Sequence, residues 1–303
     1  MTPTYHSGVH RFTVFVAICT FLLLIAGALV TSNDAALSVP DWPLSYGSLT
    51  PPMVGGIVNE HSHRVIAAGV GLLTVILAVL LTMKDERRWV KVLGWTAVGA
   101  VIAQGVLGGL TVLLNLHYGM PVAHACLAQI FFGIVVSLAV FTSHWWISNQ
   151  PQLEDRGSPS IRTMATTNAA VIFFQVVLGA GFRHQDIPVW PHIAGAFAVL
   201  FMVMWTAVTL RKRFSQSLEL AKARLLLHAI FGMQFLLGFG AYWSRIATAG
   251  APEPLSIMVI FTVIHTVVGA LLFAISVLIV LLCYRLVPSG DKVSAVSQRE
   301  AAA

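Results

Sequence analysis

The chain has 303 residues, of which 57% are hydrophobic and only 10% are charged. Soluble proteins carry about a quarter charged residues, so this composition excludes an ordinary soluble enzyme and indicates helices that cross a membrane. The formal net charge of +6 is therefore a signal of membrane orientation, and it does not indicate a nucleic-acid partner.

Eight apolar runs follow one another along the chain, each long enough to cross a membrane as a helix. They cover residues 11–31, 62–83, 92–114, 120–147, 163–183, 192–210, 223–243 and 255–285. The first run is long for a signal-peptide core and no small-residue cleavage site follows it, so we expect a helix of the mature protein. The sequence predicts an all-α membrane protein with eight transmembrane helices.

Lysine and arginine gather in alternate connections between these helices. Of the 18 residues of these two types, all but Arg64, Arg183 and Arg245 lie near the termini or between helices 2–3, 4–5 and 6–7. The positive-inside rule then places both termini in the cytoplasm of a cell whose plasma membrane the protein spans. We expect the long connection 32–59 to form an ordered cap at the outer face, and the tail from about residue 288 to be disordered.

Two halves of the chain repeat one plan. The connections after helices 1 and 5 read VPDWP (39–43) and IPVWP (187–191), and helices 3, 5 and 7 contain Gln followed four residues later by Gly. Helix 1 has LLIAG at the matching place, ending at Gly27. We expect two pseudo-symmetric four-helix bundles, over residues 1–150 and 151–303. Their parallel orientation weighs against inverted-repeat transporters.

One histidine recurs at the same depth on each even-numbered helix: His63, His124, His192 and His265. An ionisable side chain inside a membrane is costly and by default marks a functional site, although a structural hydrogen bond explains any single one. Two imidazoles in a four-helix bundle can clamp a haem iron from both faces, whereas zinc wants three or four clustered ligands. The glycines of the repeat would let a backbone approach the flat haem, or would simply allow close helix packing.

The three arginines outside the basic connections fit the same reading. Arg64, Arg183 and Arg245 are candidate partners for the haem propionates, which need charge-assisted hydrogen bonds. The alternative is that they extend to the membrane interface.

The stretch NEHSHR (59–64) makes the halves unequal. On a helix, Glu60 shares a face with His63 and Arg64, while His61 points away from that face. The matching stretch WPHIAG around His192 has no carboxylate. This difference indicates that one half performs chemistry and the other holds a permanent cofactor, unless Glu60 merely interacts with the helix dipole.

The ordered set of motifs resembles the heme A synthases, membrane enzymes that oxidise a methyl group of heme O to the formyl group of heme A. The resemblance covers nearly the whole chain, and the motifs that carry it are GALVT (27–31), WPLSYG (42–47), EHSHR (60–64), QGVLGGLTV (104–112), AH (123–124), LGAGFRH (178–184) and IHT (264–266). It implies that His63 and His124 flank the substrate haem, that His192 and His265 ligate haem b, and that Glu60 is catalytic.

The chain departs from that family in two places. Many members carry a cysteine pair in the first outer connection, which here reads NDAALSVPDWPLSYG without cysteine. The three cysteines, Cys19, Cys126 and Cys283, lie in apolar runs, so we expect small buried residues and no disulfide. His192 also lacks the following arginine.

The expected activity is therefore oxidation of heme O in successive steps, with Glu60 accepting a proton or positioning water. Expected partners are heme O, membrane lipid, an electron acceptor and the farnesyl transferase that makes heme O; homo-oligomerisation stays open. The alternative is a non-enzymatic cytochrome b with two permanent bis-histidine haems, and a transporter is the least favoured reading.

Overall fold

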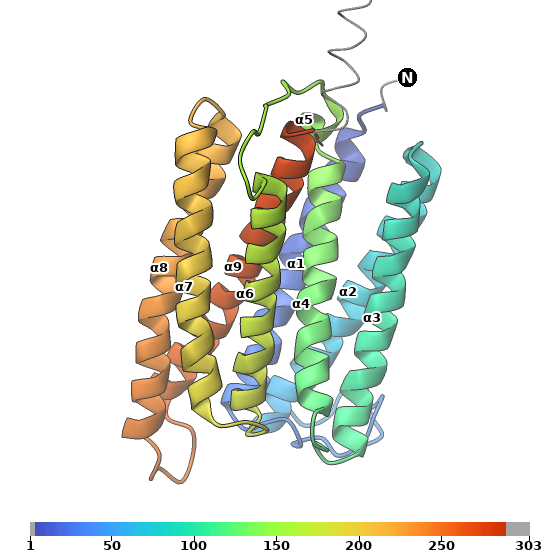
Figure 1. Cartoon of the computed structure of the whole chain (residues 1–303). Coiled ribbons are helices and arrows are strands. Elements are labelled where there is room, and N and C mark those ends of the chain that lie inside the picture. The colour runs from blue at the N-terminus through green and yellow to red at the C-terminus, as the bar shows by residue number, and fades with distance from the viewer. Residues whose placement is uncertain (1–3, 289–303) are drawn as a thin grey trace, which may run out of the picture.

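The fold is all-α in the computed structural model, which describes residues 4–288 (Figure 1). The helices are α1 (Ser7–Ser32), α2 (Gly56–Lys84), α3 (Arg88–Leu113), α4 (Met120–Phe141), α5 (His144–Ile147), α6 (Ile161–Arg183), α7 (Val189–Arg213), α8 (Leu218–Ala247) and α9 (Ser256–Leu286). All but the short α5 are long and apolar enough to cross a membrane, which makes 8 candidate spans among these residues. The predicted fold class and helix number are confirmed, and the protein is a multi-pass membrane protein. The tail predicted to be disordered lies outside the described residues.

One predicted helix is divided in two. The run 120–147 forms α4 and the short α5, because Ser143 between them takes an extended conformation with φ −69° and ψ 149°. Its hydroxyl accepts a hydrogen bond from the backbone N–H of Trp146 at 3.2 Å and so caps α5. A serine that offers an N-cap stops one helix and starts the next even within an apolar run.

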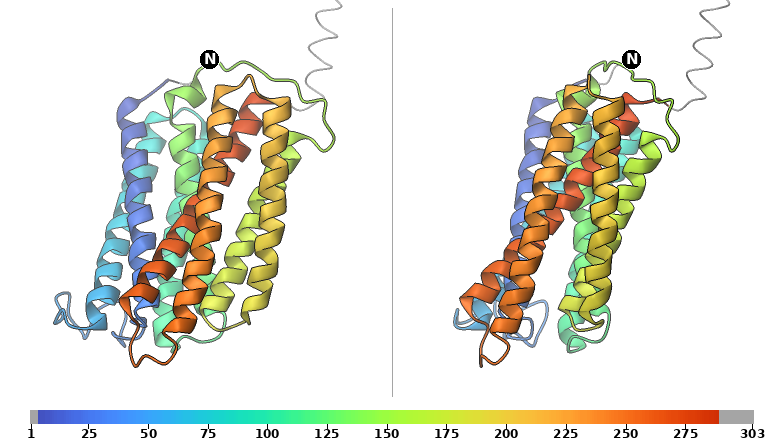
Figure 2. Two further views of the ribbon diagram at one scale, coloured as in Figure 1. Left: turned by 90° about the vertical axis from the view of Figure 1, so that its left-hand side faces the viewer. Right: turned by 60° about the vertical axis from the view of Figure 1, so that its left-hand side comes forward.

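The long helices form two closed rings. In the first, α1, α2, α3 and α4 each contact their neighbours, and α1 also contacts α4; in the second, α6, α7, α8 and α9 do the same. The rings meet through α9, which contacts α1 and α4, and through α4 against α6. Figure 2 shows α9 running obliquely through the middle of the molecule. The residue boundary near 150 between two domains stays a prediction.

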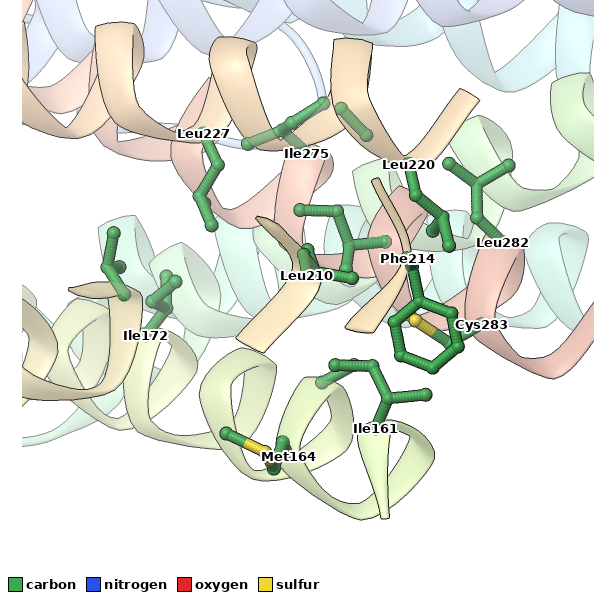
Figure 3. Close-up of a cluster of buried hydrophobic side chains, with 14 of the residues drawn as sticks. Ile161, Met164, Ile172, Leu210, Phe214, Leu220, Leu227, Ile275, Leu282 and Cys283 are labelled. Carbon is green, nitrogen blue, oxygen red and sulfur yellow. The ribbon is translucent and has the colours of Figure 1, made fainter. Parts of the chain in front are cut away.

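Each ring has its own apolar core. The cluster of the second ring joins α6 to α9, and Figure 3 shows Ile161, Met164 and Phe214 packed around the sulfur of Cys283. A separate cluster in the first ring includes Val16, Leu77 and Leu138. All three cysteines are free, as predicted; Cys283 is buried, while Cys19 and Cys126 are half-buried.

The two ends of the molecule differ in composition. We call the end that carries the α1–α2, α3–α4, α6–α7 and α8–α9 connections the histidine end, and the opposite end the basic end. Figure 1 places the start of α1 and the close of α9 together at the basic end. Between the ends, large apolar side chains such as Leu236 (71% exposed) and Phe201 (62% exposed) face outward, as helices in lipid require.

Candidate functional site: four histidines and a clamped connection

Each of the four predicted histidines packs against a glycine of the preceding long helix. A Cβ added to that glycine would meet the imidazole Cε1 at 3.1 Å for Gly27 and His63, 3.0 Å for Gly108 and His124, 2.9 Å for Gly179 and His192, and 3.4 Å for Gly238 and His265. The nearest ring atom is Cε1 in every case and Nδ1 is second. The four rings therefore present the same atom, Cε1, to the glycine, where the sequence repeat predicted only a similar depth.

These glycines make room for the imidazoles of the next long helix, which agrees with the expectation that they allow close helix packing. That they also let a backbone approach a haem stays a prediction. An added Cβ on Gly179, at 2.9 Å, would force the ring of His192 to move, and one on Gly27 or Gly108 would press the ring by a few tenths of an ångström.

Three of the four histidines also contact a glutamine one turn before that glycine. The amide nitrogen of Gln104 lies 3.2 Å from Nε2 of His124, and that of Gln175 lies 3.0 Å from Nδ1 of His192. The amide nitrogen of Gln234 lies 3.4 Å from Nε2 of His265. Gln104 and Gln175 also donate to the backbone carbonyls of His124 and His192, at 3.0 and 2.8 Å. The sequence showed these glutamines as a repeat, but not as histidine partners.

The imidazoles fit a haem iron. Nδ1 of His63 is buried and makes no hydrogen bond within residues 4–288, which leaves a nitrogen for a metal. In His124, His192 and His265 a metal would take the ring nitrogen that the glutamine amide now contacts. The ring centroids of His192 and His265 are 6.2 Å apart. Since a metal–imidazole bond is about 2 Å long, two rings on opposite sides of one iron have centroids roughly 6 Å apart.

Glu60 and Arg64 form a buried pair that holds the α1–α2 connection. Glu60 is 3% exposed, and its Oε1 accepts from Arg64 at 2.6 Å while its Oε2 accepts from the Val39 N–H at 2.8 Å. Arg64 also donates to the carbonyls of Asp41 and Leu44, both at 2.7 Å, and to that of Val39 at 3.1 Å. Both terminal nitrogens of Arg64 are thus engaged, which disfavours this residue as a propionate partner.

The clamped connection covers part of the first ring. The carboxylate of Asp41 accepts from the N–H groups of Tyr46 and Gly47, both at 2.7 Å, and these bonds, that of Gly47 first, lower the pKa of Asp41. The indole of Trp42 lies against Gly109 of α3, where a Cβ would meet its ring at 2.6 Å. Gly109 adjoins Gly108, so Trp42 packs next to the position of His124. Neither the Trp42 contact nor the Asp41 turn was predicted.

His61 points to the connection and not to the haem ligands. Its Nδ1 lies 2.9 Å from the Ser45 hydroxyl, as expected from the helical offset between His61 and His63.

The second ring has a different polar centre, formed by Arg183. This side chain reaches α1, where it donates to the Ala28 carbonyl and the Ser32 hydroxyl, both at 2.8 Å, and α9, where it donates to the Thr266 hydroxyl. Arg245 lies over the ring of Phe182 at 5.3 Å. Neither arginine has a carboxylate partner in the described part of the chain, where the salt bridges involve Arg64, Arg87, Arg156 and Arg213.

The α6–α7 connection joins the two rings and holds a histidine that the sequence did not single out. The Gly119 N–H donates to the Asp186 carboxylate at 3.1 Å. Burial, together with the positive charge of Arg183, lowers the pKa of His184 to about 4. His184 is half-buried in this connection.

Comparison with known proteins agrees with this arrangement. The family model COX15-CtaA, described as cytochrome oxidase assembly protein, matches residues 56–189. A heme A synthase of Halalkalibacterium halodurans is 29% identical over 152 residues, 49% of this chain and 51% of that protein. One of Symbiobacterium thermophilum is 28% identical over 173 residues, 54% and 55% of the two chains.

A third relative carries a different name. A protoheme IX farnesyltransferase of Haloarcula marismortui is 36% identical over 126 residues, 41% of this chain and 26% of that protein. The chain spans about half the length of the heme A synthases that it matches.

The matched segment contains α2, α3, α4 and α6, and with them Glu60, His63 and His124. The family and the site therefore overlap mainly in the first ring. On this match and these relatives, the chain is similar to the COX15-CtaA family of cytochrome oxidase assembly proteins and to the heme A synthases.

Proposed function

We propose that the protein is a heme A synthase, an oxidoreductase that converts a methyl group of heme O to the formyl group of heme A. The observation that carries the proposal is the asymmetry of two otherwise matching sites. Both rings hold a pair of imidazoles against glycines, but only the first adds a buried carboxylate one turn from a histidine. In a pure electron-relay protein that carboxylate would serve only to hold the α1–α2 connection.

In this proposal the first ring takes the substrate. His63 and His124 orient heme O at the histidine end, and its farnesyl tail lies among the apolar helices and lipid. In this proposal the methyl group is oxidised in two successive two-electron steps, each of which takes an oxygen atom from water and passes two electrons to an external acceptor. The first step gives an alcohol and the second a gem-diol that loses water to the aldehyde. Protons leave with the electrons, and Glu60, buried with one oxygen facing Arg64 and the other Val39, accepts a proton or positions water.

The second ring keeps the resident cofactor. His192 and His265 would hold haem b, which supplies one-electron transfer when bound. Arg245 is the propionate partner we favour, since among the described residues it has no carboxylate partner and makes no hydrogen bond. Arg64 and Arg183 are the weaker candidates, because both terminal nitrogens of each already donate within the protein.

The setting follows from the charge pattern and the relatives. We propose that the basic end faces the cytoplasm of a prokaryotic cell and the histidine end the outside. Heme O would come from a farnesyl transferase in the same membrane. Part of a protein named protoheme IX farnesyltransferase is similar to this chain. Because a sequence like this one occurs in the same chain as that name, the match supports a farnesyl transferase as the partner.

The test combines pigment extraction with a Glu60→Gln variant. The purified protein is expected to yield haem b plus heme O, heme A or an intermediate; two equivalents of haem b alone would favour the cytochrome alternative. Glutamine keeps an acceptor for Val39 but cannot take a proton, so we expect haem content to persist and heme A formation to fall by about 100-fold. Glu253→Gln, an exposed acid in the α8–α9 connection, is the matched control. Wild-type heme A formation in Glu60→Gln would remove the catalytic role.

A further inference from the structure

An apolar groove lies at the basic end, where the two rings meet. It has a volume of about 640 Å³, is open to the surroundings, and is lined by α1 and α4 of the first ring and by α8 and α9 of the second. In the left view of Figure 2, α4 is visible between α1 and α8 at this end. The volume is within the range of small-molecule sites, and none of the four histidines that face a glycine lines the groove.

The groove is about as long as one leaflet of a membrane is thick. Along α1 its lining begins at His10 and ends at Phe21, a distance of about 16 Å at 1.5 Å per helical residue. The hydrocarbon part of one leaflet is about 15 Å thick. The wall is apolar over this length, and Ile18 in it is 54% exposed. The groove therefore has the length and the polarity that suit a lipid chain in the leaflet at the basic end.

The charged side chains of the lining stand together at the basic end of the groove. The polar residues that line it are His10, Ser143, Glu219 and Lys222. Glu219 and Lys222 are three residues apart in α8 and share one face of this helix. Within residues 4–288 neither takes part in a salt bridge, and the Glu219 carboxylate accepts one hydrogen bond, from the Ser217 hydroxyl at 3.2 Å. A cation and an anion thus stand side by side without neutralising each other.

We propose that this groove binds one phospholipid of the leaflet at the basic end, and that the head group it selects is phosphatidylethanolamine. An acyl chain would lie along the apolar wall, with the phosphate at Lys222 and the ammonium at Glu219. A head group with both charges satisfies both side chains, whereas phosphatidylglycerol presents only a second anion to Glu219. Because helices of both rings line the groove, the bound lipid would fill the seam between them. The proposal is independent of the haem sites at the histidine end.

The experiment is native mass spectrometry of the full-length protein in detergent. Delipidated protein is offered phosphatidylethanolamine and phosphatidylglycerol with identical acyl chains at equal concentrations. We expect one retained phosphatidylethanolamine, bound about 5-fold more tightly than phosphatidylglycerol, which is the effect of one partly exposed ion pair.

Two charge variants test the contacts to the head group. Glu219→Gln should remove the preference between the two lipids, because the ammonium loses its partner. Lys222→Met should weaken the binding of both lipids by about 5-fold, since both carry a phosphate. Glu86→Gln and Lys212→Met are the matched controls: these exposed residues lie at the same end but outside the groove, and their variants should bind as the wild-type protein does.

A filling variant tests the groove itself. Ala139 of α4 lines the groove, so Ala139→Phe should abolish retention of either lipid. Ala229→Phe is the control, because Ala229 is an exposed residue of α8 outside the groove. Added phosphatidylethanolamine should raise the Tm of the wild-type protein and of Ala229→Phe, but not that of Ala139→Phe. The same thermal scans show whether each variant is folded.

The inference is overturned if the wild-type protein retains no lipid, binds both lipids equally, or keeps its lipid in a folded Ala139→Phe variant. A dimer that forms without retained lipid would also overturn it, since a second copy of the chain would then cover the groove. Heme A formation is measured on the same preparations. Heme A made by protein that retains no lipid would sink this inference alone, and retained lipid without heme A would sink only the enzyme proposal.

Discussion

The two rings share a scaffold and differ in what surrounds the histidines. Both place imidazoles against glycines at the histidine end. The first ring adds the Glu60–Arg64 pair and a long connection clamped over α3, and leaves His63 without a glutamine. The second has a short connection, two glutamine-held histidines and a buried Arg183. One helical plan thus supports two histidine sites that differ through a few side chains at one end.

The sharpest way to break the comparison is to fill the glycine positions. Gly179→Ala should displace His192, whose Cε1 would lie 2.9 Å from the new Cβ, while Gly238→Ala meets His265 at an ordinary 3.4 Å. Both act on the same pair of imidazoles, so we expect Gly179→Ala to lose about 10-fold or more in haem affinity and Gly238→Ala to lose little. Haem titration followed by the Soret band measures this.

Gly232→Ala is the control, because a Cβ on this residue of α8 meets nothing within 4 Å. Equal haem affinity in all three variants would show that the close contact between glycine and imidazole has no bearing on ligand position.

A second comparison removes the polar centre of each ring. Arg64→Leu leaves the buried Glu60 carboxylate without its cation, and Arg183→Leu removes donors to Ala28 and Ser32 of α1. We expect each to cost about 3 kcal/mol of unfolding free energy, with different local effects. Hydrogen exchange should rise in the 33–55 connection for Arg64→Leu, and where α1 meets α6 and α9 for Arg183→Leu. Identical exchange patterns would contradict the separate roles.

The smallest predicted effect is the loss of the Asp41 turn at acidic pH. The pKa of Asp41 is lowered below its ordinary value of 3.8, chiefly by the N–H groups of Gly47 and Tyr46. A carboxyl with a lowered folded pKa stabilises the turn fully above its unfolded pKa, and that stability is lost as the pH falls through the folded value. Protection of the Tyr46 and Gly47 amides, corrected for intrinsic exchange, should therefore fall only below about pH 4. Asp41→Asn should lower the protection of these two amides at neutral pH as well.

The sequence was sufficient for the eight long helices and for the repeat that places four histidines against matching glycines. Apolar length dictates a membrane span regardless of tertiary context, and helical spacing separated His63 from His61 before any coordinates. It could not show that Arg64 binds loop carbonyls or that Trp42 lies on Gly109, because a connection's path depends on residues far away in the chain. The glutamine contacts are an intermediate case. The sequence showed that the glutamines repeat four residues before a glycine, but it did not show that each contacts a histidine of the next long helix.

The fastening of the α1–α2 connection has a consequence for how the protein is made. The three cysteines are free and none lies in that connection. Its geometry depends on non-covalent contacts, chiefly those of Glu60, Arg64 and Asp41. Charged groups associate as soon as the chain folds, whereas a disulfide must wait for an oxidant and a thiol partner. Maturation of this connection therefore needs no thiol-oxidising machinery outside the membrane, and reductants should leave it closed.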